Sequence, residues 1–284
     1  MDADHHRPDV TAAGRARAAA QAPTVAVIGC GWLGTPLATR LIERGSVVFG
    51  TTTRAGKLPA LAALGIRAVM FDLNHDPQAV PVASAYVITI PPPGITGYAG
   101  KVAAVVESID AAARPVVFCS STSVYPDEDR TMVESDVLPG DVPAAGEADA
   151  APHGTRRGEL LAAEGACARH AGHVILRLGG LYGAGRHPVT FLAGRTGVPR
   201  PLAPVNVVHL DDVVGVVMAI LDRRVAGEVF NVCSDRLRTR EAFYTAAARE
   251  LGLPAPVFDA SDPSGGKRVD SGKLVRDLGF RFSR

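Results

Sequence analysis

The sequence has few of the features on which several classes of protein depend. Only 5% of its 284 residues are aromatic and 21% are charged, and the formal net charge at pH 7 is +1. So small a net charge creates no field that would attract nucleic acid or an anionic membrane surface, and few rings are available to stack on bases. No apolar run reaches the length of about 20 residues that spans a bilayer. We therefore expect a soluble globular protein with no nucleic-acid or membrane partner.

Cysteine is also scarce. Cys30, Cys119, Cys167 and Cys233 lie far apart, with no Cys-x-x-Cys pair and no neighbouring histidines at metal-ligand spacing. This pattern predicts no metal site and buried free thiols in a reducing compartment. The N-terminus has charges but no hydrophobic segment behind them, so no secretory signal is expected. Both observations favour a cytoplasmic protein.

Beyond a short tail, the sequence alternates between two kinds of segment. Residues 1–22 have no apolar stripe, which predicts a disordered tail. Short β-branched runs, typical of buried parallel strands, then alternate with helix-like stretches. The expected strands are 24–29, 46–51, 67–73, 84–90, 114–121 and 172–178, and the expected helices are 33–44, 56–64, 98–112 and 156–170. This alternation predicts an α/β fold, a Rossmann-type doubly wound parallel sheet with a small C-terminal lobe.

The predicted fold divides the chain into two parts. Residues 23–178 would form a dinucleotide-binding core that 206–232 complete, while 179–205 and 233–284 would build a compact substrate-binding lobe. Thr239 is expected to begin one helix of this lobe and Gly279 to end another. Five cations of these segments either meet an anionic substrate or are solvated, and solvation is favoured for most of them: Arg186, Arg195, Arg200, Lys267 and Arg268.

Two stretches leave their role open. The acidic segment 127–151, rich in Pro, Gly and Ala, predicts either a mobile loop over the site or plain surface, and mobility is favoured. The alanine-rich faces of 98–112 and 156–170 either pair subunits in a homodimer or pack on the sheet.

The motif "GCGWLG" follows the first expected strand and precedes a helix. It places Gly29, Gly31 and Gly34 in a G-x-G-x-x-G pattern, with Trp32 and Leu33 between the last two glycines. Such glycines permit a tight turn, a close approach of the backbone to a pyrophosphate, and close packing of helix on strand. The free amides at the helix end then face the anion. We therefore predict a dinucleotide-binding site.

The end of the second expected strand indicates which dinucleotide binds. NAD-binding sites place a carboxylate there for the ribose hydroxyls, yet no Asp or Glu occurs between Glu43 and Asp72. Arg54, with Lys57, could instead pair with a 2′-phosphate, and Thr53 could donate a hydrogen bond to it. We predict NADP as the cofactor in preference to NAD.

Further segments carry a family resemblance. "FDL" (71–73), "CSSTSVYP" (119–126), "LRLGGLYGAGR" (176–186), "VNVVHLDDV" (205–213) and "VFNVCSD" (229–235) follow one another in the order found in the extended short-chain dehydrogenase/reductases, the NAD-dependent epimerase/dehydratase family. The chain resembles this family over nearly all of 24–284.

The resemblance implies roles for individual residues. Asp72 and Leu73 would flank the adenine, and Ser121 would occupy the position of the catalytic Ser or Thr. Arg177 and Tyr182 would lie near the nicotinamide and the substrate. Apart from the resemblance, "TIPPPG" (89–94) ends an expected strand at the carboxyl edge of the sheet, so Pro91 belongs either to a stiff wall beside the nicotinamide or to a simple rigid turn. Ser120 is also predicted for the cofactor site. His209, Asp211 and Asp212 are expected to be structural, with one of the two aspartates capping the following helix.

One feature of the family is missing. Its members use a Tyr-x-x-x-Lys pair, in which the lysine lowers the pKa of a tyrosine that exchanges a proton with the substrate. Counting back from Glu164 places Arg156 in the tyrosine position and Leu160 in the lysine position. From Pro126 to Leu181 the chain contains no tyrosine and no lysine at all. The chain therefore resembles an atypical subgroup that lacks the pair.

The sequence is compatible with three functions. The chain is an oxidoreductase acting on a small carbonyl, hydroxyl or imine substrate with another proton donor, an epimerase or dehydratase, or a cofactor-binding sensor without catalysis. Loss of the Tyr-x-x-x-Lys pair should impair epimerisation or dehydration more than simple oxidation or reduction, because epimerisation needs an acid and a base as well as transient oxidation. The candidate proton donors are Ser121, Ser123, Tyr125, His153 and Arg156.

Overall fold

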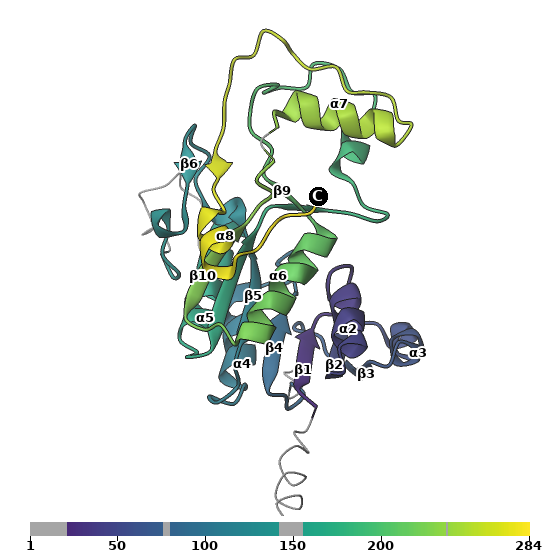
Figure 1. Ribbon diagram of the computed structural model, residues 1–284, viewed down its shortest axis with the longest axis vertical. Helices are drawn as coiled ribbons and strands as arrows, with labels where there is room; N and C mark the ends of the chain where they lie inside the picture. Colours follow the sequence, from purple (N-terminus) through teal and green to yellow (C-terminus); the bar gives the residue numbers. More distant parts are fainter. Residues whose placement is uncertain (1–21, 76–79, 142–155, 237) are drawn as a thin grey trace, which may run out of the picture.

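A computed structural model describes residues 22–75, 80–141, 156–236 and 238–284. His153 and most of the expected tail lie outside these ranges. The centre of the molecule is a seven-stranded sheet in the order β10-β7-β5-β4-β1-β2-β3, and every pair in it is parallel (Figure 1). The predicted Rossmann-type fold is confirmed. The order reverses between β1 and β4, where the carboxyl ends of the strands leave a crevice for ligands.

The elements of the sheet and its crossover helices follow the predicted alternation. In chain order they are β1 (Thr24–Ile28), α2 (Gly34–Glu43), β2 (Val47–Thr52), α3 (Leu58–Ala63), β3 (Arg67–Met70), β4 (Ala85–Ile88), α4 (Tyr98–Glu107), β5 (Val116–Ser121), α5 (Arg156–Ala168), β7 (His173–Leu178), α6 (Leu210–Arg223) and β10 (Glu228–Val232). The helix expected over 98–112 ends earlier, because Ser108 donates to the Val105 carbonyl and Asp110 accepts the Ala112 amide in a turn.

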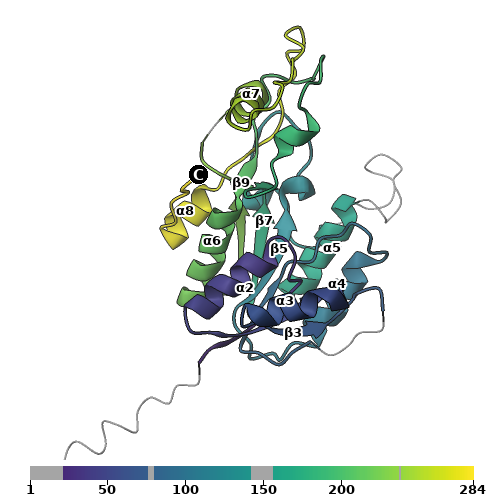
Figure 2. The ribbon, with the colours of Figure 1, turned by 90° about the vertical axis from the view of Figure 1, so that its right-hand side faces the viewer.

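Successive strand residues point to opposite faces, and each face has its own hydrophobic core. Val25 and Val27 join the core beneath α2 and α6, whereas Ala26 and Ile28 join the core beneath α4 and α5. Figure 2 shows these two helix pairs on opposite sides of the sheet. The alanine-rich faces of α4 and α5 contribute Val102, Leu160, Leu161 and other side chains to this second core, so the two helices pack on the sheet and on each other.

Smaller elements lie outside the sheet. Two short parallel pairs join β6 (Thr131–Met132) to β11 (Arg268–Val269) and β8 (Gly180–Tyr182) to β9 (Val207–His209). The helix α7 (Arg240–Glu250) packs with the 3-10 turn Pro188–Phe191 around a minor cluster of Val189, Ala247 and Ala248. Figure 1 places α7 beyond the carboxyl ends of the sheet.

Both predicted helix signals of the C-terminal segments are confirmed. The Thr239 hydroxyl accepts the Ala242 amide at the start of α7, and Gly279 (φ 54°) ends α8 (Gly272–Leu278) in the left-handed conformation. Leu274 and Leu278 of α8 are buried in the core beside α6, although the predicted division counts this segment with the small lobe. The division itself stays a prediction.

One expectation about local structure was wrong. The α6 helix is capped by His209, whose Nδ1 accepts the Asp211 amide, and not by an aspartate. Asp212 instead accepts hydrogen bonds from Ser283 and Arg284. Of the segment 127–151, residues 127–141 are described, and they contain β6 and a turn in which Asp136 accepts the Val133 amide. Residues 142–151 lie outside the described ranges, so the mobility of this segment stays a prediction.

No helix among the described residues is long and apolar enough to cross a membrane. Within the same ranges, no group of three or more His, Cys, Asp or Glu side chains could hold a metal ion.

Candidate functional site

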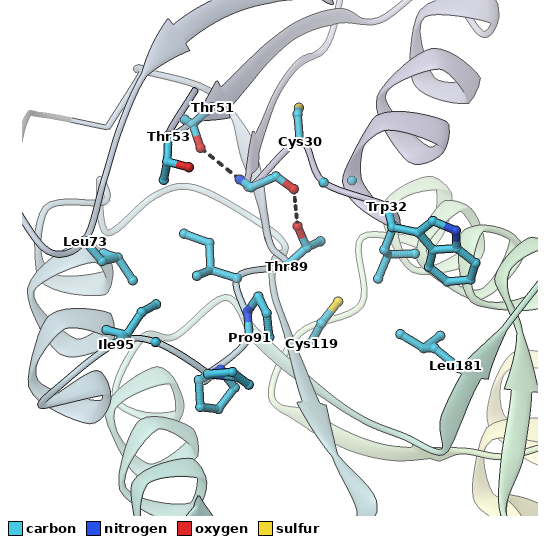
Figure 3. A pocket seen from close by; sticks show the side chains of 18 of the residues that line it. Cys30, Trp32, Thr51, Thr53, Leu73, Thr89, Pro91, Ile95, Cys119 and Leu181 are labelled. Carbon is cyan, nitrogen blue, oxygen red and sulfur yellow. Dashed lines mark hydrogen bonds between the residues drawn. The ribbon is translucent and has the colours of Figure 1, made fainter. Parts of the chain in front are cut away.

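A cavity of about 820 Å³ crosses the carboxyl ends of the parallel strands. Its wall takes residues from the ends of β3, β2, β1, β4, β5 and β7 in turn, and so it spans the point at which the strand order reverses. Figure 3 shows Leu73 and Ile95 on one side of this cavity and Trp32 and Leu181 on the other. The size and place fit an elongated ligand laid along the edge of the sheet.

Hydrogen bonds from the neighbouring strands hold the glycine turn at the centre of the cavity. Gly29 has φ +110°, a conformation that favours glycine, and its amide donates to Thr51 Oγ1 at 2.8 Å. Its carbonyl accepts from Thr89 Oγ1 at 2.7 Å, and both bonds are drawn in Figure 3. The turn is therefore fixed from β2 on one side and from the end of β4 on the other.

The other two glycines meet different requirements. A Cβ atom on Gly34 would lie 2.1 Å from the Gly29 carbonyl oxygen, so only glycine permits the helix to pack this close to the turn. A Cβ on Gly31 would meet nothing within 4 Å, so this glycine faces open space. Leu33 precedes α2 without any side-chain hydrogen bond to the helix amides. The Thr35 amide donates to the Gly31 carbonyl at 3.1 Å, and Pro36 has no N–H. The Gly34 amide at the start of α2 is left for an anionic ligand, and the arrangement fits the pyrophosphate of a dinucleotide.

Cations outnumber carboxylates along the cavity wall. Arg54 and Lys57 follow β2, Arg156 begins α5, and Arg186 follows β8. Asp72 is the one acidic side chain among the lining residues, and it accepts the Asn74 amide at 2.9 Å. The wall therefore presents net positive charge, which suits a ligand carrying several phosphates.

The end of β5 brings two serines with different hydrogen bonding to the cavity wall. The Ser120 hydroxyl donates to Glu164 Oε1 at 2.5 Å, so towards the cavity its oxygen can act only as an acceptor. Ser121 Oγ accepts from the Ser123 amide at 3.2 Å and from the Ser123 hydroxyl at 3.1 Å. The Ser121 proton is thereby left to donate into the cavity.

Cys119, which directly precedes Ser120 in β5, also lines the cavity. Burial raises the pKa of its thiol to about 12, so the side chain is neutral at physiological pH. All four cysteines are free thiols, and Cys119 is half-buried whereas the other three are buried as expected.

Tyr125 and Arg177 belong to a buried network and do not line the cavity. Arg177 and Glu164 are both fully buried, and Arg177 Nη2 donates to Glu164 Oε2 at 2.7 Å. Arg177 Nη1 also donates to the Tyr125 hydroxyl at 2.9 Å, and that hydroxyl donates to Asn231 Oδ1. Burial raises the pKa of Tyr125 to about 12, against the opposing effect of Arg177. The structure therefore places neither residue at the candidate ligand site, in contrast to the prediction.

Most of the other residues predicted for the site line the cavity, and a few do not. Those that line the cavity are Gly29, Gly31, Trp32, Leu33, Gly34, Thr53, Arg54, Asp72, Leu73, Pro91, Ser120 and Ser121. Ser123 lies behind Ser121, and His153 falls outside the described residues. Arg156 and Leu160, the positions reached by counting back from Glu164, both lie on the cavity wall.

Other lining residues had weak signals in the sequence or none. Thr89 is a polar residue at the end of a predicted strand, which could have suggested its bond to the glycine turn. Gly179, Gly180 and Leu181 contribute through backbone or apolar surface, and such contributions leave no motif.

A second, smaller hollow of about 340 Å³ adjoins the cavity and shares Gly180, Leu181 and Arg186 with it. Of the cations expected to meet a substrate, Arg186 lines both spaces. Arg200 instead pairs with Asp127 at 2.7 Å and donates to the Gly265 carbonyl, and Lys267 donates to the Tyr125 carbonyl at 2.8 Å. Arg240 lines the smaller hollow and was not predicted.

Comparison of the sequence with known proteins identifies a relative. The chain is 35% identical over 276 residues to Protein YeeZ of Escherichia coli strain K12, an alignment that covers 91% of this chain and 95% of YeeZ. The chain belongs to the YeeZ family. The same identity holds for YeeZ of the O157:H7 strain, and no protein-family model matches the sequence.

Solved structures similar to this YeeZ-family protein share its fold. MoeE5, solved in complex with UDP-glucose and NAD, is 21% identical with a TM-score of 0.69 over 92% of this chain and 94% of MoeE5. A short-chain dehydrogenase/reductase superfamily protein from Agrobacterium tumefaciens with bound NAD is 19% identical with a TM-score of 0.66 over 92% and 93% of the chains. Other matches carry the name of an epimerase or dehydratase. The predicted resemblance to this fold is confirmed.

Proposed function

We propose that the protein binds NADP(H) and catalyses hydride transfer with a small carbonyl, hydroxyl or imine substrate. The observation that carries the proposal is the glycine turn, with its uncapped helix end, at the centre of a cation-lined cavity. MoeE5 and the Agrobacterium protein, which share the fold, were solved with NAD bound. When bound, the nicotinamide would supply or accept the hydride.

The preference for NADP(H) over NAD(H) is inferred from the end of β2. Thr53, Arg54 and Lys57 line the cavity there, and the first carboxylate that follows in the chain is Asp72, beyond β3. A guanidinium can form paired charge-assisted hydrogen bonds with a 2′-phosphate. A ribose without this phosphate would find no carboxylate at this strand end to accept its hydroxyls.

Proton handling is assigned to the serine and the arginine that face the cavity. Ser121 can donate its proton to a substrate oxygen, because both of its accepted hydrogen bonds come from Ser123. The Ser123 hydroxyl would return a proton to the Ser121 oxygen and take one up from solvent. Arg156 begins α5 on the same wall, and its charge would stabilise negative charge that develops on that oxygen. A positioned general acid contributes roughly 100- to 10,000-fold, so we expect slow turnover compared with enzymes that have a dedicated tyrosine.

Epimerisation or dehydration of a nucleotide sugar is the second candidate. In its favour, MoeE5 was solved with UDP-glucose and also with UDP-glucuronic acid. Against it stands the sequence from Pro126 to Leu181, which offers no tyrosine or lysine to move protons on both faces of a sugar. Net oxidation of NADPH separates the two functions, because an epimerase leaves the cofactor unchanged.

The decisive experiment compares cofactor affinities by fluorescence titration. We expect wild-type protein to bind NADPH at least about 10-fold more tightly than NADH. Arg54→Ala should weaken NADPH binding by about 10- to 100-fold, since hydrogen bonds to charged groups contribute about 1.5–3 kcal/mol, and should leave NADH binding nearly unchanged. Arg40→Ala is the matched control, because Arg40 pairs with Glu43 on the outer face of α2. Tighter binding of NADH would refute the assignment, and turnover would then be sought with a panel of carbonyls and imines.

A further inference from the structure

The smaller hollow is continuous with the cofactor cavity but has a wall of its own. The two spaces meet at Gly180, Leu181 and Arg186 of the segment that follows β7. Beyond this junction the wall comes from the turn Pro188–Phe191, the approach to β9, and the first residues of α7. A ligand at the β5 end of the main cavity could therefore extend into the hollow.

The charged side chains that line the hollow are all positive. Arg186 and Arg240 line it, and no lining residue is acidic. The Arg186 guanidinium lies 5.2 Å from the centre of the Trp32 ring, which holds it at the junction without neutralising it. Neither arginine forms an ion pair with any residue in the described part of the chain.

Tyr244 adds a neutral donor to these two cations. It lies one turn beyond Arg240 on α7 and faces the same hollow. Burial raises the pKa of its hydroxyl, although the neighbouring Arg240 lowers it, so the proton stays in place at neutral pH. Within the described ranges this hydroxyl has no hydrogen-bond partner. A cation and a free O–H on one helix face together suit an acceptor-rich anion.

We propose that the smaller hollow binds the anionic end of the substrate, a carboxylate or a phosphate, with Arg240 as its anchor. This inference rests on the proposed function, since it extends the same site towards its substrate. A volume of 340 Å³ corresponds to roughly eleven water molecules at about 30 Å³ each. That space fits the arm of a small metabolite. The predicted substrate class is therefore a small carbonyl, hydroxyl or imine compound that carries a carboxylate or phosphate.

The test uses calorimetric titration of the full chain saturated with NADPH. The bound cofactor then prevents the anionic probe from binding at the positions of the cofactor phosphates. Inorganic phosphate and malonate are the two probes, and they distinguish a phosphate site from a carboxylate site. We expect one of them to bind the wild-type protein, Arg240→Ala to weaken that binding by about 10-fold or more, and Arg240→Lys to restore most of it. Arg249→Ala is the control, because Arg249 lies in the last turn of the same helix.

NADPH affinity of every variant is measured in parallel. Unchanged NADPH binding together with weakened anion binding in Arg240→Ala supports the inference. Anion binding that is equal in the wild type and Arg240→Ala, or absent from the wild type while NADPH binds, overturns it and leaves the proposed function intact. If NADPH itself does not bind, the proposed function fails, and titration of the cofactor-free protein still decides whether Arg240 is needed for an anion.

Discussion

The Ser120 hydroxyl lies 2.5 Å from Glu164 Oε1 and so connects the cavity wall to a fully buried carboxylate. The same carboxylate accepts hydrogen bonds from two nitrogens of Arg177, Nε and Nη2, and Arg177 is itself completely buried. Arg177 also donates to the carbonyls of Glu134 and Val137 and to the Tyr125 hydroxyl. One ion pair thus ties β5, α5, β7 and the segment before residue 142 together behind the candidate site.

Breaking this pair on one side should be costly. We expect Arg177→Met to lower the free energy of unfolding by about 3–5 kcal/mol, because it leaves Glu164 buried without a counter-charge. The double variant Arg177→Met with Glu164→Leu should be more stable than Arg177→Met alone, since no charge then remains buried. Urea unfolding followed by circular dichroism measures both.

An exposed ion pair provides the control for this measurement. Arg44 and Asp222 lie 2.6 Å apart with more than half of each side chain exposed, so Arg44→Met should cost less than about 1 kcal/mol. A similar cost for Arg177→Met would show that water reaches the buried pair.

The sheet was predictable because its central strands are buried on both faces and are therefore short apolar runs rich in β-branched residues. "TVAVI" and "HVILRL" are such runs, and both are central strands. The two-residue strands β6 and β11 were not predicted, because they depend on a pairing between segments more than 130 residues apart. Two residues carry too little periodicity to indicate a strand on their own.

The candidate site was predictable where backbone geometry demands a residue type and unpredictable where distant segments meet. Gly29 and Gly34 could be predicted from the sequence motif, because a side chain at either position would collide with the turn or its neighbours. Tyr125 and Arg177 also belong to the segments that carry the family resemblance. In the structure, however, Arg177 donates a hydrogen bond to the Tyr125 hydroxyl in the buried network, and neither residue lines the cavity. Arg240 has no motif around it, and only the packing of α7 against the turn Pro188–Phe191 brings it to the hollow.

The glycine turn provides a test of the cofactor site that needs no knowledge of the substrate. In Gly34→Ala the new Cβ would lie 2.1 Å from the Gly29 carbonyl oxygen, so the turn or the helix must shift. Relief of such overlap costs about 1–3 kcal/mol, and we expect NADPH to bind about 5- to 100-fold more weakly.

Gly100→Ala is the matched control for Gly34→Ala. Gly100 lies inside α4 with nothing within 4 Å of its Cβ position, so alanine should leave NADPH binding unchanged and slightly stabilise the helix. Equal NADPH affinity in Gly34→Ala and Gly100→Ala would mean that the cofactor does not use the turn.

The pH dependence of stability should report the aromatic cluster under α7. His187 stacks on Phe243 with 5.4 Å between ring centres, and its Nδ1 accepts the Val189 amide. Burial lowers the pKa of His187 below its ordinary value of 6.5, and the charge of Glu250 only partly opposes this. In the unfolded chain this histidine takes up a proton from about pH 6.5 downwards, whereas the folded protein resists protonation, so its contribution to stability is lost as the pH falls below that value.

His187→Asn removes the titration while keeping an oxygen that can accept the Val189 amide. The variant should be less stable than the wild type at pH 7.5, because the ring contacts are lost, but its melting temperature should fall less between pH 7.5 and pH 5.5. His75→Asn is the control, since the His75 side chain is 82% exposed, and its melting temperature should follow that of the wild type. Melting curves of His187→Asn and wild type that fall in parallel over this range would show that the folded protein accepts the proton on His187 without penalty.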